Sequence, residues 1–173
     1  VGPRVASGLQ ADAVVALFIS ILGIIFYISL RFEFIFGVAA IVALLHDILI
    51  SIGIIAVVDH FFGSTFPIKI NLAELAAILT IIGYSINDTI VVFDRIRENM
   101  RVLAKKRLPF SEIVNLSINQ TLTRTLWTSV TTLLVTLVLL FSTTESVRGF
   151  AFIFAIGVVT GTYSSIFVAS PVL

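Results

Sequence analysis

The sequence predicts an all-α membrane protein, and three observations support this prediction. Of the 173 residues, 58% are hydrophobic and 12% are charged, whereas a typical soluble domain is about 25% charged. The mean hydropathy is +1.14, and so few polar side chains cannot cover a surface that faces water. Five stretches also reach the length of about 20 mostly apolar residues that a membrane-spanning helix needs. This composition excludes a disordered chain, a nucleic-acid-binding domain and an ordinary soluble enzyme.

The five predicted spans belong to a single transmembrane domain over residues 1–173. Most of their connections are short, but the connection over residues 94–118 is long and holds most of the charge. The chain begins at Val1 and stops at the apolar Leu173, so we expect a fragment from which an earlier span and an external domain are missing. The predicted spans cover about residues 12–30, 35–58, 72–93, 119–141 and 147–170.

The distribution of lysine and arginine predicts the orientation in the membrane. Alternate loops lie on the same side, and cytoplasmic loops carry an excess of basic residues. The loop over residues 94–118 is therefore predicted to be cytoplasmic, with the N-terminus of the chain outside and its C-terminus inside. The basic residues on the predicted inner side are Arg31, Arg95, Arg97, Arg101, Lys105, Lys106 and Arg107, and those on the outer side are Arg4, Lys69 and Arg148.

The second half of the long loop has an amphipathic pattern. Its apolar residues Phe110, Ile113, Val114 and Ile118 recur at roughly helical spacing, with polar residues between them. This pattern is typical of a short helix that lies at the membrane interface. A solvated basic turn that only sets the topology is the alternative.

Charged side chains inside the predicted spans are the most informative feature, because each costs about 2.5–3.5 kcal/mol on insertion scales. Asp88 lies in the third span, next to Asn87 and six residues before Asp94. Arg124 lies in the fourth span, beside a stripe of threonines. Both enter from the cytoplasmic side on antiparallel neighbours, so they can lie at similar depth and pair.

Each of these polar groups also has a structural interpretation. Asn87 and Asp88 can simply hydrogen-bond a neighbouring helix, and Arg124 can extend its side chain to the membrane surface. His46 and Asp47 lie near the middle of the second span, where a kink or a structural hydrogen bond is the plainer interpretation. The polar residues predicted to support the Asp88–Arg124 pair are His46, Asp47, Ser85, Asn87, Thr125 and Thr128.

A pair of glycines in the fifth span predicts close helix packing. Gly157 and Gly161 are four residues apart, a spacing that lets another helix approach closely. The signal is weak by itself, because glycine is common in membrane helices.

The sequence shows no signature of an enzyme. It contains no cysteine, and it has no phosphate-binding glycine loop, nucleophile elbow or HExxH motif. Its two histidines, His46 and His60, do not make a metal site. We therefore expect neither catalysis nor a cofactor nor a metal.

Residues 83–99, Gly-Tyr-Ser-Ile-Asn-Asp-Thr-Ile-Val-Val-Phe-Asp-Arg-Ile-Arg-Glu-Asn, resemble the signature of the SecF family of protein-export membrane proteins. The resemblance covers essentially the whole chain. The signature distinguishes the SecF family from the paralogous SecD family, in which a run of the Val-Asp-Ala-Asn type is expected in place of Ser85-Ile-Asn-Asp88. Supporting matches are Val1-Gly-Pro3, Leu45-His-Asp47, Ser117-Ile-Asn-Gln-Thr-Leu-Thr-Arg-Thr125, Arg148-Gly-Phe150 and Gly161-Thr-Tyr-Ser-Ser-Ile166.

The resemblance implies a fold and a role. Members of this family have six spans, with an external domain between the first and the second, and resemble half of a resistance–nodulation–division (RND) bundle. They work with SecD and use the proton-motive force to promote the movement of proteins across the membrane. The family's proton-relay aspartate and arginine correspond to Asp88 and Arg124 of this chain.

The resemblance also implies partners and a location. The expected partners are SecD, the SecYEG channel, YajC, YidC, the translocating polypeptide and the lipid bilayer. The expected location is the plasma (inner) membrane of a bacterium or an archaeon. One alternative stays open, a structural scaffold in which Asp88 and Arg124 form a static ion pair. The signature argues against a superfamily relative that exports lipid or drug.

Overall fold

The computed structural model describes residues 3–63, 72–106 and 108–173, which form a bundle of long helices without any β-strand in these ranges. The prediction of an all-α membrane fold is confirmed, because five of these helices are long and apolar enough to cross a membrane. The long helices are α1 (Pro3–Arg31), α2 (Phe34–Phe62), α3 (Leu72–Val102), α4 (Phe110–Leu139) and α5 (Glu145–Ser164). Three short elements accompany them: η1 (Ala104–Lys106), the π-helical turn η2 (Ser165–Ala169) and α6 (Ser170–Val172).

The connection between α3 and α4 is shorter than the predicted loop over residues 94–118. α3 runs on to Val102, and α4 begins at Phe110. The predicted separate amphipathic helix is therefore replaced by the first turns of α4. Contacts between the two helices explain the extension: Asn99 Nδ2 donates to Ser117 Oγ at 2.8 Å and to Gln120 Oε1 at 2.9 Å.

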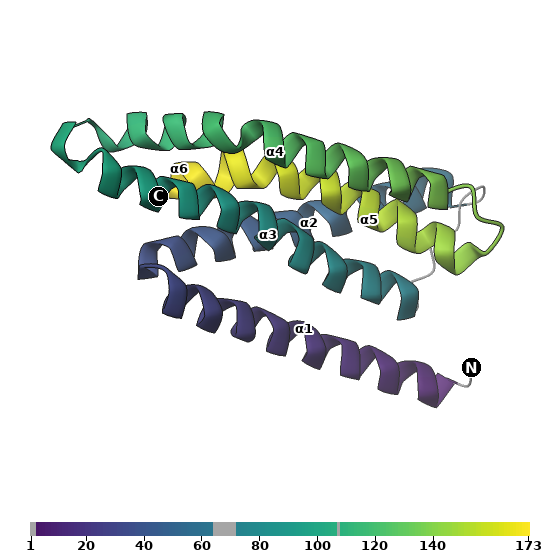
Figure 1. The fold of residues 1–173 in the computed structure, drawn as a ribbon. Coiled ribbons are helices and arrows are strands. Elements are labelled where there is room, and N and C mark those ends of the chain that lie inside the picture. Colours follow the sequence, from purple (N-terminus) through teal and green to yellow (C-terminus); the bar gives the residue numbers. More distant parts are fainter. Residues whose placement is uncertain (1–2, 64–71, 107) are drawn as a thin grey trace.

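α3 occupies the centre of the bundle. It packs against the other four long helices, most extensively against α5, whereas α1 packs mainly against α2 and α3. Figure 1 shows α1 along one edge of the bundle and the N- and C-termini at opposite ends. An odd number of membrane crossings produces this placement of the termini.

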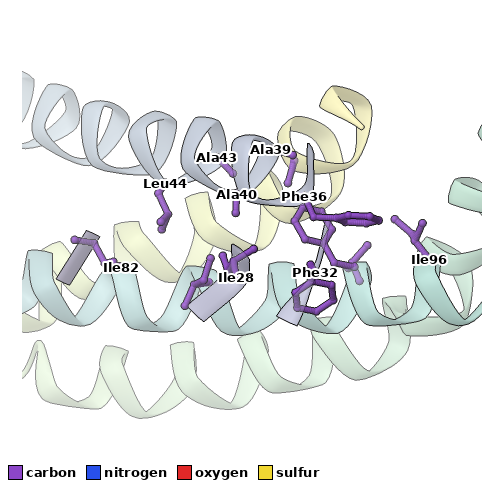
Figure 2. Packing of buried hydrophobic residues seen from close by; sticks show 13 residues of the cluster. Ile28, Phe32, Phe36, Ala39, Ala40, Ala43, Leu44, Ile82 and Ile96 are labelled. Carbon is purple, nitrogen blue, oxygen red and sulfur yellow. The ribbon is translucent and has the colours of Figure 1, made fainter. Parts of the chain in front are cut away.

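The corner between α1 and α2 packs on α3 through aromatic rings and small side chains (Figure 2). The Phe93 ring contacts Phe36 edge-on at a centroid distance of 5.1 Å and Phe32 at 6.4 Å. Ala39 and Ala40 on α2 are fully buried, and such small side chains let membrane helices approach closely. This cluster fixes α2 against α3 and so determines which face of α2 is turned toward the interior.

Candidate functional site

Polar side chains gather where α2, α3, α4 and α5 meet. Hydrocarbon offers no hydrogen bonds, so polar groups within a membrane bundle depend on partners inside the protein. Two aspartates are among the charged members of this set, and each has its own surroundings. The buried polar side chains from these helices include Asp47, Ser51, Ser85, Asp88, Thr125, Ser129 and Ser164.

Asp47 is fully buried, with 0% of its surface exposed. Ser85 on α3 donates a hydrogen bond to Asp47 Oδ2, and Ser164 on α5 donates to the same oxygen at 2.7 Å. The second oxygen, Oδ1, lies 3.1 Å from His46 Nδ1. Both oxygens therefore have partners, and the carboxyl group joins α2 to α3 and α5.

Gly157 and Gly161 lie where α5 crosses α3. A Cβ atom on Gly161 would lie 3.0 Å from Ser85 Cβ, and one on Gly157 would lie 2.0 Å from Ile81 Cγ1. A larger residue at Gly157 would require the Ile81 side chain or the helix to shift, since real Cβ atoms essentially never approach a neighbour as closely as 2.0 Å. The two glycines thus bring Ser164 and Ser85 within reach of one carboxyl group.

Asp88 is also buried, with 3% of its surface exposed. It lies on α3 three residues after Ser85 and interacts with Ser129 and with the charge of Arg124, both on α4. Its Oδ2 atom has no hydrogen-bond partner within the described part of the chain, and the same holds for Thr125 Oγ1. The surroundings of Asp88 are therefore incomplete, unlike those of Asp47.

Arg124 is exposed on α4 and forms no salt bridge with Asp88 among the residues that the structure describes. The two residues nevertheless lie on neighbouring helices and attract each other electrostatically. The ion pair predicted from the sequence is thus not formed in this structure.

The other predicted supporting residues differ in their placement. Ser85 and Thr125 are buried, and Asn87 is exposed on α3. The Thr128 hydroxyl donates to the Arg124 carbonyl of its own helix at 2.8 Å. Sequence reasoning did not select Ser164, although a serine three residues after Gly161 within an apolar span was an available signal.

Ser129 was also not selected as a site residue from the sequence. Its hydroxyl donates to the Thr125 carbonyl at 2.8 Å and lies 2.6 Å from Thr162 Oγ1 of α5. Tyr84 on α3 donates to the same hydroxyl at 3.5 Å. Ser129 thus connects α3, α4 and α5 beside Asp88.

Five apolar helices that enclose two buried aspartates define a polytopic membrane protein with ionisable groups inside its bundle. Residues 1–173 match the family described as "Protein export membrane protein SecD/SecF, C-terminal", and the chain belongs to this family. The resemblance that the sequence predicted is confirmed.

Proteins and a solved structure of high similarity support this assignment. The "Protein translocase subunit SecF" of Rhodothermus marinus is 50% identical over 173 residues, which cover all of this chain and 55% of that protein. The protein of the same name from Desulfurispirillum indicum is 50% identical over 174 residues, which cover all of this chain and 53% of that protein. The crystal structure of SecDF in its super-membrane-facing form is 44% identical and matches with a TM-score of 0.84, covering 99% of this chain and 22% of that one. The chain thus spans about half the length of these curated relatives.

Proposed function

We propose that this chain is the membrane-spanning part of a SecF-type translocase subunit that works with SecD and uses the proton-motive force to promote protein translocation. The observation that carries the proposal is the buried carboxyl group of Asp88, whose Oδ2 lacks a partner within the described residues. Arg124, the arginine that attracts it, lies exposed on the adjacent helix. The proposed role needs no covalent chemistry, because a proton is the species taken up and released.

The unpartnered oxygen can be stabilised in two ways. A proton neutralises the carboxyl group, or the Arg124 guanidinium turns inward and pairs with the ionised form. Because the proton and the Arg124 guanidinium compete for the same carboxyl group, proton binding is linked to the position of the Arg124 side chain. A charge that crosses 100 mV supplies about 2.3 kcal/mol, which is enough to bias such a two-state element.

The decisive variant is Asp88→Asn in the full-length protein, reconstituted with SecD and the SecYEG channel in vesicles. We expect it to abolish proton-driven stimulation of export while insertion and binding to SecD persist. The double variant Asp88→Asn/Arg124→Gln is expected to be equally inactive, because no titratable carboxyl group remains. Arg124→Lys is expected to be impaired, since a compact ammonium does not reproduce a planar guanidinium.

Asp94→Asn is the matched control, because Asp94 lies on the same helix but is exposed and pairs with Arg31 at 3.4 Å. It is expected to retain proton-driven export. Full proton-driven export by Asp88→Asn at normal protein levels would contradict the relay. The chain would then be better explained as a scaffold that holds SecD and the channel together.

We further propose that the α3–α4 connection faces the cytoplasm, in the plasma membrane of a prokaryotic cell, and that YajC and YidC accompany the complex. Ser111, exposed at the start of α4, and Thr143, exposed in the opposite turn, provide a matched pair of labelling sites. In a background without other cysteines, an impermeant thiol reagent added to intact cells should label Thr143→Cys and not Ser111→Cys. The reverse pattern would overturn the orientation.

A further inference from the structure

We infer that His46 and Asp47 together form a second proton-binding site, separate from Asp88 and located at the contact of α2, α3 and α5. The inference rests on the geometry of this pair and does not depend on the proposed relay. The pair consists of a buried carboxyl group and an imidazole whose side chain is 30% exposed. The imidazole thus lies partly at the outer face of the bundle, and the carboxyl group beside it lies in the interior.

The hydrogen bonds of His46 and Asp47 show where the protons of this pair can lie. Asp47 Oδ1 and His46 Nδ1 lie 3.1 Å apart, so one proton must lie between them, on either the oxygen or the nitrogen. The hydroxyls of Ser85 and Ser164 both donate to Oδ2, which identifies Oδ2 as an acceptor. The remaining place for a further proton is His46 Nε2.

The pair has two protonation states, which differ in net charge. With only the shared proton, the pair carries one negative charge, and with a second proton on Nε2 it carries none. Asp47 has no exposed surface, and an uncompensated charge inside a membrane protein is costly. Proton uptake at Nε2 therefore neutralises the pair, wherever the shared proton resides.

The groups around the pair come from α5 and α3. Tyr163 on α5, which is itself titratable, stacks on the His46 ring at a centroid distance of 6.2 Å and an angle of 28°. The group that α3 directs at Asp47 is Ser85, which is not titratable in this range, and Asp88 follows three residues later. Both proton sites thus involve α3. The site at His46 and Asp47 contacts α3 through Ser85, and the other site is Asp88 on α3 itself.

Magnetic resonance of the full-length protein with SecD in a lipid bilayer, containing isotope-labelled histidine, tests the inference directly. The signal that His46→Gln removes belongs to His46. We record this signal from about pH 5 to pH 8 and expect the doubly protonated imidazole to appear as the pH is lowered. Asp47→Asn, which removes the counter-charge, should lower the protonated fraction at a given pH severalfold.

His60→Gln is the matched control, because His60 is the chain's other histidine and is exposed near the end of α2. It should remove a different signal and leave the His46 titration unchanged. A His46 signal that stays neutral across this range would overturn the inference, and so would a titration that Asp47→Asn leaves unaltered. If Asp47→Asn fails to fold, the titration of the unmodified protein decides the question by itself.

The outcome is distinguishable from that of the Asp88 experiment. Full export by Asp88→Asn together with a titrating His46 would reject the relay and retain the second site. Loss of export in Asp88→Asn together with a His46 that does not titrate would retain the relay and reject the second site.

Discussion

Asp47 and Asp88 are buried to a similar degree on neighbouring helices, but their surroundings differ. Asp47 contacts side chains from α2, α3 and α5, and both of its oxygens have partners. Asp88 interacts with α4, and its Oδ2 has no partner among the described residues. Asp47 thus joins three helices, whereas one oxygen of Asp88 has no partner among the described residues.

The packing of the two helix pairs explains this difference. Gly157 and Gly161 bring α5 so close to α3 that Ser85 of α3 and Ser164 of α5 both reach the Asp47 carboxyl group of α2. On α4, the hydroxyls of Thr121 and Ser129 donate to carbonyls of their own helix at 3.0 and 2.8 Å, and Ser129 also contacts Tyr84 of α3 and Thr162 of α5.

Gly157→Leu should give the largest effect, because it separates α5 from α3. Its Cβ would overlap the Ile81 side chain, and overpacking of this severity is expected to cost at least about 3 kcal/mol. Yield of the complex with SecD and thermal unfolding in detergent measure the loss. Val158→Leu, an enlargement at the next buried position, is the control, and equal yields for both variants would contradict the close contact.

Asp47→Ala should destabilise the protein more than Asp88→Ala does, which tests the comparison directly. Removing Asp47 leaves the Ser85 and Ser164 hydroxyls without their acceptor, at an expected cost of about 2 kcal/mol. Removing Asp88 eliminates a carboxyl group whose Oδ2 already lacks a partner, so the expected change is within about 0.5 kcal/mol of zero. Equilibrium unfolding in mixed micelles provides both values, and equal losses would show that the two sites hold the bundle equally.

Gly161→Ala should have a smaller effect, because its Cβ would lie 3.0 Å from Ser85 Cβ and displace that side chain slightly. We expect a net loss of about 1 kcal/mol, since local crowding outweighs the gain in helix propensity. Gly53→Ala on α2 is the control, because a Cβ there meets nothing within 4 Å. That variant should be neutral or slightly stabilising, and a shift in unfolding temperature of the same sign for both would contradict the prediction.

Asn87→Ala should have the smallest effect on stability, although Asn87 is adjacent to Asp88. Its side chain is exposed, and exposed substitutions away from special features usually change stability by less than about 0.5 kcal/mol. Thermal unfolding of the variant checks this. A loss above about 1 kcal/mol would mean that polar contacts around Asp88 extend to the surface of α3.

Much of the fold is determined by the sequence itself. The number of spans and their approximate bounds follow from apolar runs, because the length needed to cross a bilayer is a local property of the chain. The cost of a charge in hydrocarbon identifies Asp88 and Arg124 as unusual without any structure. The four-residue spacing of Gly157 and Gly161 likewise indicates a close helix contact.

The tertiary structure alone decided how these elements meet. The extension of α3 to Val102 depends on Asn99 contacting Ser117, a pairing between separate helices. The sequence places His46 and Asp47 side by side, but the rotation of α2 against α3 and α5 turns Asp47 inward. Side-chain partners across helices depend on helix rotation and separation, which are set by packing of the whole bundle and not by local sequence.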